Sequence, residues 1–301
     1  MFKPFTRITC AVVMSAGIGG TASAHMYTQF PAWWRGGLPK ATQWEAVYQD
    51  GAWGPVYMNI GHACGHTEVM ASSPRTTQVA VVVPGNNWAS QVIDYPLLDG
   101  SYEFPPLDKP YRVIGPASPD ASGYDWGIST AQAEGIPALN RTYQFYAEAS
   151  PVYDKAPRAT VWVGDQGIGG YSIGQVVLWV QLPEIPKKSC VTDVQYFFAA
   201  AQFCPKSNLE GALPAQAWLL GTTSTWSDQY VGGAPYQWAP YLRMTRDLKA
   251  KPLPKSCGGK GQVVSVYASS DDIDAYLRPV VESKSGDARQ ISLEQWVRQN
   301  Q

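Results

Sequence analysis

Charged residues and histidine are scarce in this sequence, and no apolar run in it reaches the length of a membrane span. Asp, Glu, Lys and Arg make up 16% of the 301 residues, with 23 basic against 24 acidic side chains. A nucleic-acid interface needs concentrated basic charge, so this balance argues against a nucleic-acid partner. A transmembrane helix needs about 20 apolar residues. We therefore expect a mature chain that does not span a membrane.

The first residues have the features of an export signal. Lys3 and Arg7 provide a positive start, residues 8–18 form a short apolar stretch, and Ala22-Ser23-Ala24 is a cleavage site of small residues. This pattern predicts a signal peptide over residues 1–24, removed to leave His25 as the first residue. We expect the mature protein in the periplasm, or secreted to the cell surface.

Cysteine is also infrequent, and its use fits an oxidising compartment. Of the five cysteines, Cys10 lies in the predicted signal peptide. An even set of four remains, which predicts two disulfides, with three pairings open. The four are Cys64, Cys190, Cys204 and Cys257. Because Cys190 and Cys204 flank a short strand-like segment, we favour a Cys190–Cys204 bond with a Cys64–Cys257 bond.

Proline and glycine interrupt the chain throughout and leave short apolar runs that favour strands over helices. The expected strands cover residues 56–60, 78–83, 159–163, 174–182, 191–201, 215–220 and 262–267. Short helices are expected only near the C-terminus, over residues 270–277 and from Ser292 onward. The fold class predicted is all-β, a sandwich or barrel with two β-rich lobes. A loop-rich stretch at 96–123 suggests a boundary between residues 25–120 and residues 121–301.

The three histidines are the most informative residues. His25 would become the mature N-terminus, while His62 and His66 lie in Gly61-His62-Ala63-Cys64-Gly65-His66. An N-terminal histidine chelates through its α-amine and its imidazole, and a further imidazole completes a histidine brace. Copper(II) favours such tetragonal nitrogen coordination. We therefore predict a copper site made by His25, His62 and His66.

Neighbouring residues supply further candidate ligands and competing interpretations. Met58 and Met70 bracket the histidine motif and are soft ligands for Cu(I), although core packing is the favoured interpretation for both. Glu68 with His62 and His66 would form a zinc site, but the spacing lacks the glutamate of the zinc hydrolase motif. Cys64 is a candidate thiolate ligand, yet a disulfide is favoured in this compartment.

The N-terminal part resembles the bacterial YcnI-like family. The likeness rests on His25, on Asn59-Ile60-Gly61-His62-Ala63-Cys64-Gly65, and on the strand segment from Thr76 to Pro84. It implies an immunoglobulin-like β-sandwich over residues 25–120 and Cu(II) binding through the mature N-terminal histidine. The family's ligand glutamate and its tryptophan would correspond to Glu45 and Trp44. His66 has no counterpart in the family pattern.

These observations favour an exported copper-binding protein that acts as a chaperone, store or scavenger. Its expected partners are the copper ion and a membrane or periplasmic copper-handling protein. One alternative is an enzyme, a copper monooxygenase of the histidine-brace type, which would need an open copper position and an aromatic binding face. Another is a structural or adhesive β protein without metal. A role other than catalysis is favoured, because the sequence around the histidines does not look like that of the monooxygenases.

Overall fold

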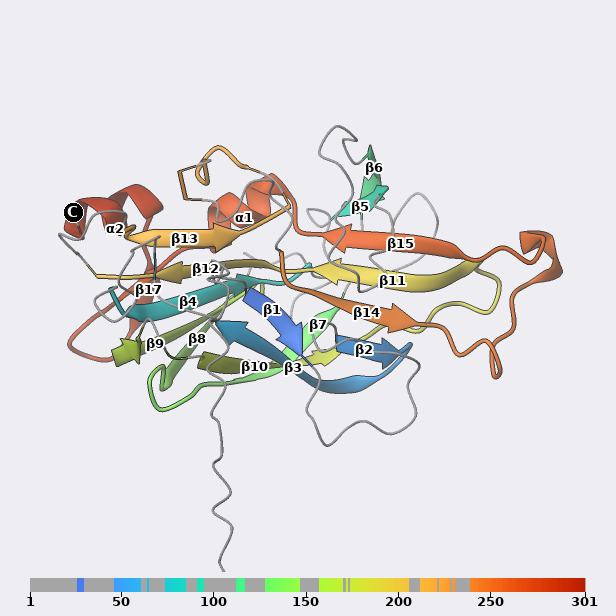
Figure 1. Cartoon of the computed structure of the whole chain (residues 1–301), viewed down its shortest axis with the longest axis horizontal. Coiled ribbons are helices and arrows are strands. Elements are labelled where there is room, and N and C mark those ends of the chain that lie inside the picture. The colour runs from blue at the N-terminus through green and yellow to red at the C-terminus, as the bar shows by residue number, and fades with distance from the viewer. Residues whose placement is uncertain are drawn as a thin grey trace, which may run out of the picture.

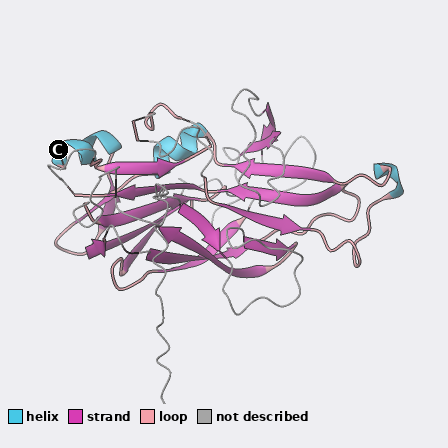
Figure 2. Cartoon of the chain, in the orientation of Figure 1, coloured by secondary structure: helices cyan, strands magenta, loops and turns pink. Residues whose placement is uncertain are grey.

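The computed structural model shows a β-rich protein with two short α-helices near its C-terminal end (Figure 2). It describes residues 26–29, 46–60, 64, 74–84, 91–94, 112–116, 128–146, 157–169, 172, 174–205, 212–220, 222–227, 229–230 and 239–300. The predicted signal peptide lies outside these residues, as does most of the expected loop at 96–123.

One layer of the fold is a four-stranded antiparallel sheet with the order β1-β3-β10-β7. Its strands are β1 (Met26–Gln29), β3 (Trp53–Ile60), β10 (Gly174–Gln181) and β7 (Ser129–Glu134). Along β10, buried residues alternate with partly exposed ones, with Val176, Leu178 and Val180 fully buried. Alternation of this kind arises because successive side chains of a strand point to opposite faces and only one face meets the core.

Two sheets form the opposite layer. The six-stranded sheet has the order β2-β14-β11-β15-β5-β6 and the five-stranded sheet the order β13-β12-β4-β9-β8. The first contains β2 (Ala46–Gln49), β14 (Tyr241–Thr245), β11 (Val191–Phe197), β15 (Gln262–Tyr267), β5 (Gln91–Asp94) and β6 (Arg112–Pro116). The second contains β13 (Ala215–Trp218), β12 (Ala199–Phe203), β4 (Thr76–Val82), β9 (Ala159–Ile168) and β8 (Arg141–Phe145). Only Phe198 separates β11 from β12, so one nearly continuous run joins both sheets (Figure 1).

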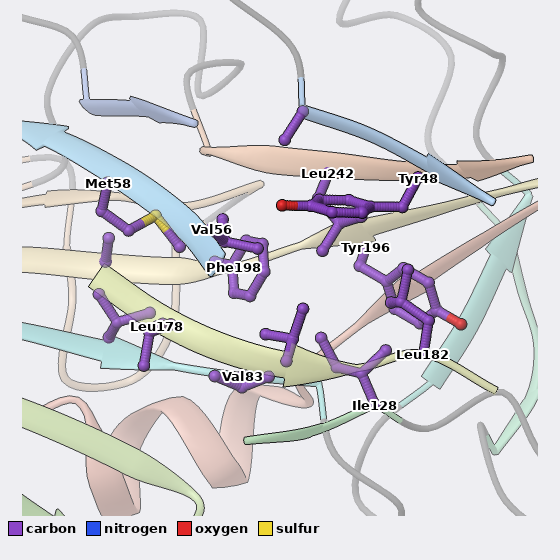
Figure 3. Close-up of a cluster of buried hydrophobic side chains, with 14 of the residues drawn as sticks. Tyr48, Val56, Met58, Val83, Ile128, Leu178, Leu182, Tyr196, Phe198 and Leu242 are labelled. Atoms are coloured by element: carbon purple, nitrogen blue, oxygen red, sulfur yellow. The ribbon is translucent and has the colours of Figure 1, made fainter. Parts of the chain in front are cut away.

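The main core lies between these layers (Figure 3). Its large buried side chains come from all three sheets and include Val56, Met58, Trp162, Leu178, Tyr196, Phe198 and Leu242. Tyr48 on β2 reaches the start of β3, where its hydroxyl donates a hydrogen bond to the carbonyl of Pro55. Burial raises the pKa of Tyr48, so this hydroxyl keeps its proton and remains a donor.

A second core covers the other face of the five-stranded sheet. It is built by α1 (Ser270–Tyr276), α2 (Leu293–Gln299) and a hairpin of β16 (Val280–Glu282) and β17 (Ala288–Gln290). Ser292 begins α2 with a capping box to Gln295, as its position before an apolar periodic run predicts. Because β4 and β12 are covered on both faces, nearly all of their residues are buried.

The predicted all-β sandwich with short C-terminal helices is therefore confirmed. The strands expected over 56–60, 78–83, 159–163, 174–182 and 262–267 all form, within one or two residues at their ends, except that β3 begins three residues earlier, at Trp53, and β9 extends to Ile168. None of the described helices has the length and apolarity needed to cross a membrane.

The expected boundary at residue 120 is wrong as a division between two β domains. Strands from both sides of it pair within each of the three larger sheets, as β4 does with β9 and β12. A cut there would separate β3 from β10 and leave unpaired the backbone groups that these two strands share. The N-terminal strands form one sandwich with the strands that follow, not a separate domain.

Candidate metal centre

Most of the predicted ligands lie outside the described residues. The structure describes the strands that come directly before or after several of them in the chain. These ligands are His25, His62, His66, Glu45, Glu68 and Met70. The strands that lead to and from the histidines are described, as is Cys64 within the motif. These flanking residues determine where a metal site in this region would lie.

Strands β1 and β3 bring the two histidine-bearing segments to one place in the four-stranded sheet. They are antiparallel neighbours, and their register pairs Met26 with Ile60 (Figure 1). Met26 is joined to His25 by a single peptide bond, and Ile60 is followed directly by Gly61 and His62. The chain therefore enters β1 and leaves β3 at the same end of the sheet.

The C-terminal end of β3 is also paired on the side opposite to β1. Gly174 at the start of β10 pairs with Ile60, so β3 ends between two hydrogen-bonded neighbours. The Asn59 side chain is 3% exposed and accepts a 2.8 Å hydrogen bond from the Gln175 amide nitrogen. These contacts fix the direction in which the chain leaves β3 toward the histidine motif.

Cys64, in the middle of the histidine motif, is bonded to Cys204 directly after β12. The sulfur atoms are 2.05 Å apart, Cys64 is fully buried, and its backbone N–H donates to Cys204 Sγ at 3.3 Å. The bond ties the segment after β3 to the five-stranded sheet of the opposite layer. It also means that the Cys64 sulfur is not a free thiolate, as the disulfide interpretation predicted.

The second disulfide joins Cys190 to Cys257, so two disulfides are confirmed but the favoured pairing of Cys190 with Cys204 and Cys64 with Cys257 is wrong. Cys190 precedes β11 and Cys204 follows β12, at opposite ends of one extended run. At about 3.3 Å per residue their Cα atoms lie roughly 45 Å apart. A disulfide tolerates no more than about 7 Å between Cα atoms.

A buried chain of polar side chains lies beside the Cys64–Cys204 bond. Thr76 Oγ1 donates to Gln202 Oε1 at 3.1 Å, and Gln202 Nε2 donates to Gln216 Oε1 at 3.3 Å. Thr76 Oγ1 also lies 3.7 Å from Cys204 Sγ. Sequence reasoning missed this group. Its signal was a glutamine inside each of two alanine-rich strand segments, Ala-Ala-Ala-Gln-Phe and Ala-Gln-Ala-Trp.

Met58 points into the main core and is fully buried there (Figure 3). It packs with apolar side chains from both layers, as the core-packing interpretation of this residue expects. In the part of the chain that the structure describes, no three His, Cys, Asp or Glu side chains gather into a metal-sized group. All three histidines lie outside that part.

The sequence matches no family model and no curated protein. Among solved structures, the chain is similar to an uncharacterized protein from Nocardia farcinica that is described as having an immunoglobulin-like fold. The two sequences are 12% identical, and the alignment covers 66% of this chain and 92% of that protein, with a TM-score of 0.32.

Proposed function

We propose that the mature chain is an exported copper-binding protein, a chaperone, store or scavenger. Copper would be held by the α-amine and imidazole of His25 together with His62 and His66. The observation that carries this proposal is the pairing of Met26 with Ile60. Met26 directly follows His25, and Ile60 directly precedes the Gly-His-Ala-Cys-Gly-His motif, so the two segments are neighbours in the sheet.

Covalent geometry makes this pairing a strong restraint on the two histidine segments. His25 is one residue from Met26 and His62 is two residues from Ile60, so few residues separate the two histidines from this pair of strands. The Cys64–Cys204 bond prevents the motif from moving far from the sheet edge. The proposal requires the new terminus and the motif to meet beside this end of β3.

The chemistry of the available donors favours copper over zinc. With Cys64 in a disulfide, the site has no thiolate and depends on nitrogen donors. An amine and two or three imidazoles suit the tetragonal geometry of Cu(II), which also has the highest affinity among the divalent first-row ions. When bound, copper would be held and exchanged, which is the chemistry of a carrier.

The two disulfides fit an oxidising compartment. Export to the periplasm or cell surface would place the protein where such bonds persist. There a membrane or periplasmic copper-handling protein would donate or receive the ion.

The decisive experiment changes only the N-terminal amine. Cu(II) affinity is measured by competition titration for the mature protein beginning at His25 and for a version with one glycine before His25. Because the added residue removes the amine chelate, we expect a loss larger than the roughly 10–100-fold cost of losing an outer-shell partner. A glycine added after Gln301 is the matched control and should change nothing.

Two results would count against the proposed centre. Unchanged affinity in the extended protein would move the site to His62 and His66, and replacement of both by alanine would then abolish binding. Absence of stoichiometric Cu(II) in the protein beginning at His25 would reject copper binding altogether. Oxidised sugar released by the copper-loaded protein with ascorbate would identify the monooxygenase instead.

A further inference from the structure

The end of the six-stranded sheet farthest from β12 carries a cluster of lysines. Two loops meet there, residues 183–190 before β11 and residues 246–261 between β14 and β15 (Figure 1). The 3-10 helix Lys255–Cys257 lies in the second loop and marks this end of the molecule (Figure 2). The lysines in these loops, which we call the lysine tip, are Lys187, Lys188, Lys249, Lys251, Lys255 and Lys260.

The backbone of the lysine tip is held rigidly. The Cys190–Cys257 bond joins the two loops. Arg246 is 5% exposed, and its guanidinium donates to backbone carbonyls of both, at 2.7 Å to Ser189, 3.0 Å to Lys187 and 2.6 Å to Lys251. A single buried side chain therefore satisfies carbonyls from both loops and holds their backbones side by side.

Three carboxylates at this end of the molecule, those of Asp50, Glu184 and Asp247, already have partners. Asp50 and Glu184 both bind the Lys251 ammonium, at 2.6 and 3.2 Å. Asp247 accepts hydrogen bonds from the backbone N–H groups of Lys249 and Ala250, at 2.9 and 3.0 Å. Local acidic groups therefore neutralise Lys251 and stabilise a turn.

The other lysines of the tip carry uncompensated charge. Lys187, Lys188, Lys249, Lys255 and Lys260 are exposed, and none of them forms an ion pair with a carboxylate in the described part of the chain. This concentration of positive charge stands out in a protein whose net charge is −1. It forms a surface to which an anionic partner would be attracted.

Leu248 distinguishes among anionic partners. It lies within the lysine tip and is 50% exposed, although large apolar side chains are mostly buried elsewhere in the described structure. A soluble polyanion would use the ammonium groups alone, whereas a bilayer offers both anionic headgroups and an apolar boundary. We propose that the lysine tip docks this protein on the surface of an anionic phospholipid membrane, with Leu248 inserted at the headgroup boundary.

Docking through this tip would also set the orientation of the molecule. The Gly51 N–H donates to the Pro183 carbonyl, so β3 begins near the tip, and it runs eight residues to Ile60. At about 3.3 Å per residue, Ile60 at the other end of β3 lies roughly 23 Å from Trp53. The inference rests on the lysines and Leu248, and it holds whether or not the histidines bind copper.

Vesicle binding tests this inference directly. The mature protein is titrated with neutral phosphatidylcholine vesicles and with vesicles that also contain phosphatidylglycerol, and we expect binding only to the latter, weakening as salt is raised. Lys255→Gln with Lys260→Gln should lower the affinity by about thirtyfold, since each lysine near an anionic surface contributes about fivefold. Lys284→Gln with Arg289→Gln removes the same charge from the exposed β16–β17 hairpin and should leave binding unchanged.

Several outcomes overturn the inference. Equal binding to neutral and anionic vesicles would remove the electrostatic basis, and an equal loss in the hairpin variant would show that the site is not the lysine tip. Leu248→Ser should weaken vesicle binding but not binding to soluble polyphosphate. If Leu248→Ser changes neither and polyphosphate binds as tightly as vesicles, the partner is a soluble polyanion and the membrane assignment fails. Thermal unfolding of each variant confirms that it is folded.

Discussion

At the scale of single residues, polar side chains inside the sandwich connect elements that are distant in sequence. Gln78 on β4 is 6% exposed, and its amide accepts from the Val280 N–H and donates to the Val280 carbonyl, both at 2.9 Å. It thereby fastens the C-terminal hairpin to the five-stranded sheet. Arg246 does the same for the loops of the lysine tip. The importance of such residues lies in the backbone groups they satisfy.

Replacing Gln78 by leucine keeps the volume of the side chain but removes both hydrogen bonds. The buried N–H and carbonyl of Val280 would lose their partners, so we expect the free energy of unfolding to fall by about 2–4 kcal/mol. Urea denaturation measures this change. Gln132→Leu, at an exposed position on β7, is the control and should stay within about 0.5 kcal/mol of the unchanged protein. If Gln78→Leu lowered the free energy of unfolding by no more than Gln132→Leu does, the C-terminal hairpin would not depend on this contact.

At the scale of elements, the short edge strand β1 is central to the proposed metal centre. It has four residues, pairs with β3 and with no other strand of the described residues, and connects the predicted mature terminus to the fold. In an antiparallel edge strand, successive N–H groups point alternately toward the neighbouring strand and away from it. Tyr27 and Thr28, paired with Asn59 and Met58, therefore differ in whether their N–H holds β1 in place.

Proline scanning of β1 uses this alternation as an internal control. Of Tyr27→Pro and Thr28→Pro, one removes a hydrogen bond to β3 and the other removes an N–H that points away. We expect Cu(II) affinity, measured by competition titration, to fall in the variant that loses the hydrogen bond to β3. The other variant should largely retain it. Retained affinity in both variants, with the protein folded, would show that β1 does not position the terminus.

At the scale of the whole molecule, the two disulfides stabilise opposite ends of the sandwich. Cys64–Cys204 links the histidine motif to the five-stranded sheet across 140 residues of sequence, and Cys190–Cys257 closes the lysine tip across 67. In the chain-entropy description, closing loops of these lengths stabilises the fold by about 5 and about 4 kcal/mol respectively. Their effects on stability should therefore be similar, while their effects on function should differ.

Replacing each pair of cysteines by serine tests the functions of the two ends of the molecule independently. Both Cys64→Ser with Cys204→Ser and Cys190→Ser with Cys257→Ser should lower the melting temperature. Only the first pair should weaken Cu(II) binding, because only that bond restrains the histidine motif, and only the second should weaken vesicle binding. If both pairs changed copper affinity equally, the effect would be a general loss of stability, and the assignment of separate ends would be contradicted.

The amino-acid pattern by itself determined the fold class, many of the strands and the two-disulfide content. Short apolar runs bounded by proline and glycine identify strands because turn chemistry and side-chain alternation are local properties. The Ser292 cap is equally local. The concentration of histidine at residue 25 and in residues 61–66 is also a property of sequence, and it is the reason to propose copper.

Only the tertiary structure decided which distant segments meet. The pairing of Met26 with Ile60, the bonding of Cys64 to Cys204, and the sharing of sheets across residue 120 are long-range contacts. A single sequence does not specify them, because strands of similar pattern have many compatible partners. Likewise, Lys187 and Lys260 are distant along the chain, and the pairing of β11 with β15, the Cys190–Cys257 bond and Arg246 bring their loops together into one charged surface.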